Sequence, residues 1–161
     1  MPFPRRRWGE QPTASCDVLL ASDGRQDFSS RAVARAAALA GDGGRVAVVT
    51  IAKIYGSSFG FPNPGLLPTK REMEERRGWV NGAIQTLERS GVVADGQIAA
   101  TRRATKKLAS IARVRRPRAV VIDASPVTGL RRLVEGDVGL ELRKKLRDDD
   151  VEVEVVPPET S

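Results

Sequence analysis

The stretch that decides the fold reads Leu108-Ala-Ser-Ile-Ala-Arg-Val-Arg-Arg-Pro-Arg-Ala-Val-Val-Ile-Asp123. Its first half has apolar residues at helical spacing, and this pattern predicts a helix over Ala104–Val114 with one apolar face. Its second half ends in consecutive aliphatic residues, which predict a buried strand over Arg118–Ala124. A helix that leads directly into a fully apolar strand is typical of α/β proteins with a parallel sheet.

The alternation of strands and helices continues on both sides of this segment. Further strands are predicted over residues 17–22, 45–52 and 97–101, and further helices over residues 28–40, 69–90 and 137–146. The segment 151–156 alternates valine with glutamate, so we expect an edge or interface strand with one buried face. Because parallel strands are joined by right-handed crossovers, the sequence predicts a five-stranded, mainly parallel sheet with helices on both faces.

The chain of 161 residues is long enough for one such domain, which we place at residues 16–157. Residues 1–15 contain three prolines and Arg5–Arg7 without a regular period, and they predict a flexible basic arm. Residues 158–161 form a tail, and residues 53–68, rich in glycine and proline, form a long loop. No apolar segment follows Arg5–Arg7, so we do not expect an export signal.

The composition excludes several classes of function. The sequence has no histidine, which excludes histidine-based triads and histidine-ligated metal sites. Its one cysteine, Cys16, cannot form an intramolecular disulfide, and its default role is that of a small, inert, partly buried residue. No apolar run approaches the roughly 18 residues that a membrane span needs. We therefore expect a cytoplasmic protein without a membrane segment.

The order of elements from Asp17 to Val156 resembles the universal stress protein family. Three local motifs carry the resemblance: Val18-Leu-Leu-Ala-Ser-Asp23-Gly24, the stretch Leu108–Asp123, and Thr128-Gly-Leu-Arg-Arg-Leu133 followed by Gly136. The resemblance implies a Rossmann-like fold of the adenine nucleotide alpha hydrolase type. Such sheets bind ligands at the carboxyl ends of their strands, where the winding order reverses.

ATP-binding members of the family carry a glycine-rich signature: glycine, two residues, glycine, nine residues, glycine, then serine or threonine. The corresponding positions here are Asp123, Pro126, Gly136 and Asp137, so only one of the four is kept. Glycines let the backbone approach phosphate, whereas proline has no N–H to donate and carboxylates repel a polyanion. We therefore expect a vestigial nucleotide site, impaired ATP binding and no cofactor.

Two aspartates of this vestigial site have more than one interpretation. Asp137 is a strong helix N-cap, and its carboxylate could also occupy the place of a phosphate and so plug the site. For Asp23, a turn-forming role before Gly24 is favoured over the contact with adenosine that the resemblance implies. The alternative hypothesis is an ATP- or AMP-binding protein, weakly hydrolysing, that keeps contacts from Asp23, Val49, Ile51 and Gly136.

The basic residues suggest a further class of partner. Residues 102–118 contain eight Lys or Arg and no acidic residue, and the whole chain carries a net charge of +7. Such a surface can contact nucleic acid, but no aromatic residue is interleaved with these cations and no reading motif is present, so nucleic acid is an unlikely partner. Arg25, Arg131 and Arg132 border the predicted crevice.

The favoured hypothesis is that the protein is a non-enzymatic stress-response or regulatory protein that acts through contacts with an unknown protein partner. The sequence shows no catalytic base, metal-carboxylate pair or phosphate-loop lysine. In the family that the chain resembles, the last strand commonly pairs across a dimer axis. We therefore expect a homodimer through Val151, Val153 and Val155.

Overall fold

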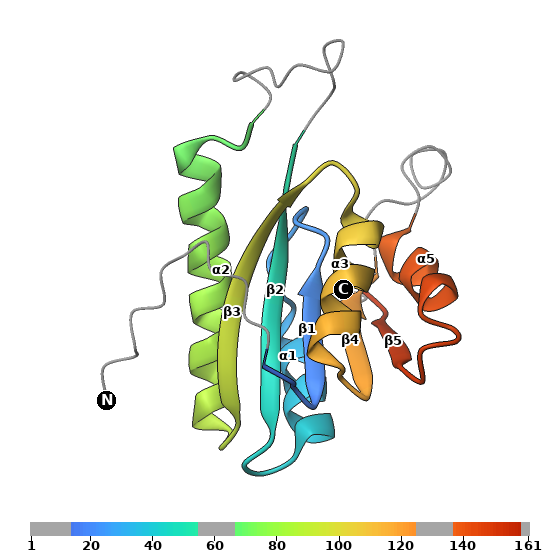
Figure 1. Ribbon diagram of the computed structural model, residues 1–161. Helices are drawn as coiled ribbons and strands as arrows, with labels where there is room; N and C mark the ends of the chain where they lie inside the picture. The colour runs from blue at the N-terminus through green and yellow to red at the C-terminus, as the bar shows by residue number, and fades with distance from the viewer. Residues whose placement is uncertain (1–13, 55–66, 125–136, 159–161) are drawn as a thin grey trace.

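Five parallel strands form the centre of the computed structural model, which describes residues 14–54, 67–124 and 137–158 (Figure 1). They lie in the order β3-β2-β1-β4-β5, and all four neighbouring pairs are parallel. Their bounds are β1 Val18–Ser22, β2 Arg45–Lys53, β3 Val93–Thr101, β4 Ala119–Asp123 and β5 Glu152–Val156. The predicted parallel α/β sheet is confirmed. Most of the predicted basic arm and part of the tail lie outside the described residues.

Two pairs of helices cover the two faces of the sheet. Their bounds are α1 Ser30–Ala40, α2 Lys70–Arg89, α3 Ala104–Arg115 and α5 Val138–Lys145. On β2, Val46 and Val48 belong to the same buried cluster as residues of α1 and α2, whereas Ala47 and Val49 belong to the cluster with α3 and α5. Successive side chains of a strand point to opposite faces of the sheet, so the two clusters lie on opposite faces. The expected coverage of both faces is therefore confirmed, with α3 and α5 on the second face.

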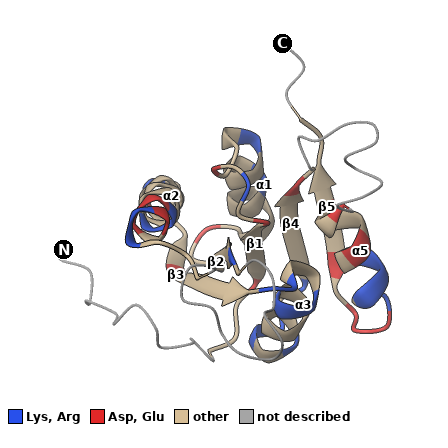
Figure 2. Cartoon of the chain, turned by 90° about the horizontal axis from the view of Figure 1, so that it is seen from above, with Lys and Arg blue, Asp and Glu red and all other residues tan. Residues whose placement is uncertain are grey.

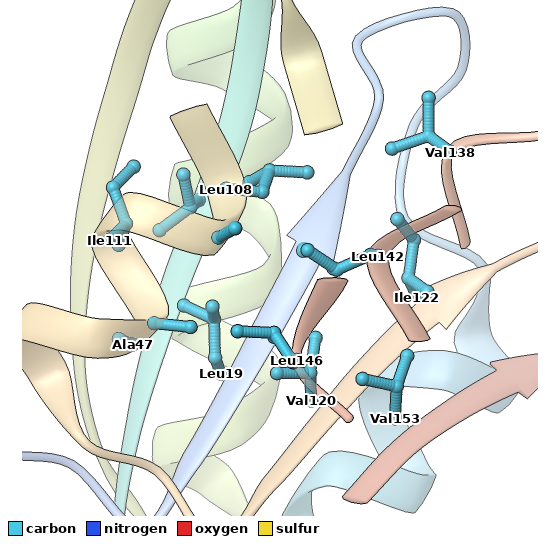
Figure 3. Close-up of a cluster of buried hydrophobic side chains, with 14 of the residues drawn as sticks. Leu19, Ala47, Leu108, Ile111, Val120, Ile122, Val138, Leu142, Leu146 and Val153 are labelled. Carbon is cyan, nitrogen blue, oxygen red and sulfur yellow. The ribbon is translucent and has the colours of Figure 1, made fainter. Parts of the chain in front are cut away.

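Aliphatic side chains hold α3 and α5 against the sheet. Leu19 and Val120 project from β1 and β4 toward Leu108, Leu142 and Leu146, and all five are fully buried (Figure 3). Burial of one leucine contributes about 1.5–3 kcal/mol to the free energy of folding. This cluster therefore fixes how the two helices sit relative to the ends of the strands.

The helices differ in how they begin. Ser29, Thr69 and Asp137 each accept a hydrogen bond from the first turn of the helix that they precede. In contrast, α3 follows Arg103, whose side chain makes no capping bond, and no acidic residue lies in its first turn. The first turn of α3 thus lacks the side-chain acceptor that the other described helices have.

Strand β3 is longer than the sequence predicts. The predicted strand covers residues 97–101, whereas the observed strand begins at Val93 and pairs with β2 along its whole length. Asp95 and Gly96 disfavour a strand locally, and pairing with the neighbouring strand overrides that preference. At Gly96 a Cβ atom would lie 2.3 Å from Cγ1 of Val80, so the glycine allows α2 to pack closely on the sheet.

Helix α2 is long but amphipathic. It spans 20 residues, and its buried positions are Val80, Ala83 and Leu87. Within the described residues, no helix combines the length and the apolar character that a bilayer span requires. The glycines at positions 78 and 82, which weaken helix propensity, do not interrupt α2.

Candidate functional site

A cavity of about 490 Å³ opens at the carboxyl ends of the strands. Four segments line it: the turn after β1, the end of β2, the connection from β3 into α3, and α5. Small-molecule sites commonly have volumes of about 300–1,000 Å³. The cavity therefore has a suitable size, and it lies at the end of the sheet where parallel α/β proteins bind ligands.

The turn after β1 is held in one conformation by its own hydrogen bonds. Gly24 has φ of +87°, and a Cβ atom at this position would lie 2.0 Å from the carbonyl oxygen of Ile51, so only glycine fits. Oγ of Ser22 accepts from the Gly24 N–H at 3.1 Å, and Nη2 of Arg76 donates to the Gly24 carbonyl at 2.7 Å. This wall of the cavity is thus preformed.

Asp23 lines the cavity, as predicted. Its Oδ1 accepts a hydrogen bond from the Arg25 N–H at 2.9 Å, and its Oδ2 lies 3.9 Å from Nε of Arg25. The first of these bonds is the one that a turn-forming aspartate makes. A contact between Asp23 and adenosine stays a prediction.

The opposite wall joins α3 to α5. Oγ1 of the buried Thr105 donates to Oε2 of Glu141 at 2.7 Å, and Val138 lies beside them on the lining. A hydrogen bond to a carboxylate is stronger than a neutral one, so it fixes the spacing of the two helices. The bond also occupies one oxygen of Glu141.

Cationic side chains dominate the lining. Two carboxylates, those of Asp23 and Glu141, face seven cations, which are Arg25, Lys53, Arg102, Arg103, Lys106, Lys144 and Lys145. Figure 2 looks toward this end of the sheet and shows Lys and Arg on α3 and α5. The electrostatic potential of such a cavity attracts anions.

Most of these cations have no partner within the described part of the chain. No ion pair or side-chain hydrogen bond is formed there by Arg102, Arg103, Lys106, Lys144 and Lys145. Elsewhere some arginines pair with carboxylates, as in Arg35 with Glu154 at 2.7 Å, whereas others, such as Arg31 and Arg89, are exposed without an ion pair in the described residues. The cavity therefore gathers five cations that are available to an anion.

The remaining predicted site residues do not lie on this lining. Val49 and Ile51 are fully buried in the core beneath α3 and α5, so their side chains offer no surface to a ligand. Gly136 lies outside the described residues. Oδ1 of Asp137 accepts from the Leu140 N–H at 3.2 Å, which confirms the prediction that this residue caps the last helix.

The carboxylate of Asp123, the first position of the degenerate signature, accepts hydrogen bonds from Ser29, the N-cap residue of α1. Its Oδ2 accepts from the Ser29 N–H at 2.9 Å, and its Oδ1 accepts from the Ser29 hydroxyl. Neither Asp123 nor Asp137 is among the residues that line the cavity. The repulsion of phosphate that we expected from these two carboxylates is therefore not a feature of the described lining.

The valines expected at a dimer interface pack inside the chain. Val153 is 5% exposed within the core, and Val151 and Val155 pack against the same cluster. On the open edge of β5, Nε and Nη2 of Arg143 both donate to the Val153 carbonyl at 3.1 Å. The side chain of Val153 is therefore not available to a partner, whereas Val151 and Val155 are only partly buried, and the homodimer stays a prediction.

Only part of the lining could be predicted from the sequence. Asp23, Arg25 and the basic stretch that begins at Arg102 were predicted near the crevice or as a charged surface, whereas five lining residues were not: Lys53, Thr105, Glu141, Lys144 and Lys145. One signal was available: Lys53 directly follows a predicted strand, and the carboxyl ends of parallel strands meet at one edge. No comparable signal marks Lys144 and Lys145, whose position depends on how α5 packs.

Comparison with known proteins agrees with this architecture. No protein-family model matches the sequence, and no curated protein matches it. Solved structures do match. A universal stress protein from Archaeoglobus fulgidus superposes with a TM-score of 0.61 and 15% identity, covering 91% of this chain and 95% of that one. The chain has the universal stress protein fold.

Two further structures of this fold match over most of their length. A member of the universal stress protein family from Burkholderia pseudomallei has a TM-score of 0.56 and 20% identity, covering 92% of this chain and 100% of that one. A universal stress protein from Archaeoglobus fulgidus in complex with dAMP has a TM-score of 0.57 and 16% identity, covering 89% and 98%. Identities this low support the shared fold only.

Proposed function

We propose that this chain is a non-catalytic universal stress protein that binds a phosphate-bearing nucleotide in the strand-end cavity. The observation that carries the proposal is the lining, in which seven cations face two carboxylates. A phosphate group adds about two negative charges and three strong acceptor oxygens, which match such a lining. The proposal adopts the nucleotide-binding alternative, because Asp123 and Asp137 do not line the cavity.

The cavity fits the phosphate part of a nucleotide better than it fits a predicted adenine contact. Arg102, Arg103 and Lys106 supply cations beside the start of α3. The side chains of Val49 and Ile51 are enclosed in the core, so contact with a base falls to other atoms of the lining. That one similar structure is a complex with dAMP supports the choice of ligand class.

Binding without hydrolysis is proposed because both carboxylates of the lining already accept hydrogen bonds. Asp23 accepts from the Arg25 N–H, and Glu141 accepts from Thr105. A general base has to be within reach of an attacking water, and the sequence contains no histidine to serve instead. We infer that the bound ligand changes how a protein partner is recognised.

Thermal unfolding in the presence of nucleotides tests this function. The purified full chain is heated with AMP, ADP or ATP, with and without magnesium, up to millimolar concentration. A ligand at 100 times its Kd stabilises a protein by about 2.7 kcal/mol, which raises the Tm of a domain of this size by roughly 5–10 °C. We expect such a rise and no release of phosphate. Unchanged Tm values with all three nucleotides would overturn the proposal.

A further inference from the structure

The part of the cavity formed by α3 and α5 carries charge that a ligand with one phosphate would not balance. In this part the described lining holds five cations, which are Arg102, Arg103, Lys106, Lys144 and Lys145, and one carboxylate, that of Glu141. A single phosphate supplies about two negative charges, whereas a chain of three supplies about four. The excess of positive charge therefore favours the longer phosphate chain.

We propose that the cavity recognises an oligophosphate chain through Arg102, Arg103, Lys144 and Lys145. The inference rests on the proposed function and names the part of the ligand that is recognised. These cations would take the role that the resemblance gives to the glycine-rich signature, of which this sequence keeps only Gly136. Arg102 and Arg103 come from the connection between β3 and α3, and the two lysines come from the last turns of α5.

The local contacts support this assignment. The bond between Thr105 and Glu141 holds α3 and α5 together, so both sets of cations border one cavity. None of the four cations has an ion pair within residues 14–54, 67–124 and 137–158. A cation without a partner is available to bind an anion without first breaking an existing pair.

The beginning of α3 strengthens the same site. Ala104 and Thr105 belong to the first turn of α3 and line the cavity. The side chain of Arg103 does not cap the helix; the Arg103 N–H donates to Oγ1 of Thr101 at 3.1 Å, but the N–H groups of Ala104 and Thr105 lack a side-chain acceptor within the described residues. Phosphate oxygens are good acceptors for such groups, and the helix dipole favours negative charge there.

An oligophosphate chain could belong to a nucleotide or be inorganic. The test therefore compares adenosine, AMP, ATP and inorganic tripolyphosphate by isothermal titration calorimetry on the full chain. We expect ATP to bind at least tenfold more tightly than AMP, and adenosine not to bind measurably. If tripolyphosphate binds as tightly as ATP, the phosphate groups alone account for the binding and the nucleoside is not recognised. Tripolyphosphate that binds more weakly than ATP but more tightly than AMP would assign a share to the nucleoside.

Two double variants locate the recognition. The variants R102Q/R103Q and K144Q/K145Q each remove two positive charges from the lining, and each should weaken ATP binding by about tenfold or more. The matched control is R31Q/R89Q, which removes the same charge from exposed positions on α1 and α2. It should change the Kd for ATP less than twofold.

The outcomes separate this inference from the proposed function. If AMP and ATP bind with equal Kd, or if both double variants bind ATP like the control, oligophosphate recognition is overturned while nucleotide binding stands. If neither nucleotide binds, the proposed function fails as well. Because all four positions are exposed, we expect each variant to keep the fold. Circular dichroism of each variant checks this.

Discussion

The two ends of the sheet use charged residues in opposite ways. At the amino end, the guanidinium of Arg115 has no accessible surface and makes a bidentate pair with Asp95, with bonds of 2.9 and 2.6 Å. Nε of Arg115 also donates to the Ala14 carbonyl. At the carboxyl end, Arg102 and Lys144 line an open cavity and have no ion pair within the described residues.

The difference separates charges that serve the fold from charges available for binding. A buried charge has to be paired, because its desolvation costs several kcal/mol. An exposed cation needs no partner in order to be tolerated. The cations around the cavity therefore need no partner for stability, and under the proposed function they are available to a ligand. The following predictions test this distinction, from the largest effect to the smallest.

The strongest test breaks the pair at the amino end. Replacement of Arg115 by methionine leaves the carboxylate of Asp95 buried without its partner, and it should lower the free energy of unfolding by about 3–5 kcal/mol. Urea denaturation measures this loss. The matched control is Arg113→Met on the same helix, which breaks an exposed pair with Asp149 and should lower the free energy of unfolding by less than about 1 kcal/mol. Equal losses in the two variants would refute the distinction.

The next test changes the turn beside the cavity. In Gly24→Ala, the methyl group meets the Ile51 carbonyl and the backbone must keep a positive φ, so we expect a loss of about 3 kcal/mol in the free energy of unfolding. The control is Gly78→Ala in α2, where a Cβ atom meets nothing within 4 Å. That variant should be more stable than the wild type by about 0.5–1 kcal/mol. If the free energy of unfolding of Gly24→Ala equals that of the wild type, the turn is not rigid.

A third test uses the cysteine near the buried pair. Burial raises the pKa of the Cys16 thiol from 9.0 to about 11, so the unfolded chain ionises first as the pH rises. The contribution of Cys16 to stability is complete below pH 9 and falls by up to about 2.5 kcal/mol as the pH approaches 11. Denaturation of the wild type and of Cys16→Ala should therefore diverge between pH 9 and pH 11. Parallel pH profiles would contradict the assignment.

The smallest expected effect concerns the cap of α5. Asp137→Ala removes the acceptor for the Leu140 N–H and should cost about 1 kcal/mol, whereas Asp137→Ser keeps a cap and should change stability by less than about 0.5 kcal/mol. Chemical denaturation measures both values. If Asp137→Ser binds ATP no better than the wild type, the hypothesis that this carboxylate plugs the site is rejected. A clear gain in affinity would restore it.

The site was less predictable than the fold, and particular residues show why. The position of Asp23 after a buried strand correctly placed it at the cavity, because strand ends are visible in the hydrophobic pattern. The alternative hypothesis kept nucleotide contacts from Val49 and Ile51; their side chains are enclosed beneath α3 and α5, and these contacts stay a prediction. Which face of a strand is covered by which helix is decided by contacts between distant segments.

The order of strands and helices and the cap at Asp137 could be predicted from the sequence because they depend on residues a few positions apart, and the parallel sheet followed from that order through the crossover rule. Tertiary structure alone decided the length of β3, the bond from Ser29 to Asp123 and the packing of Val153 in the core. It also brought Arg102 and Lys144 to one cavity. Hydrophobic periodicity and capping are local, whereas pairing between residues many positions apart requires the closed fold.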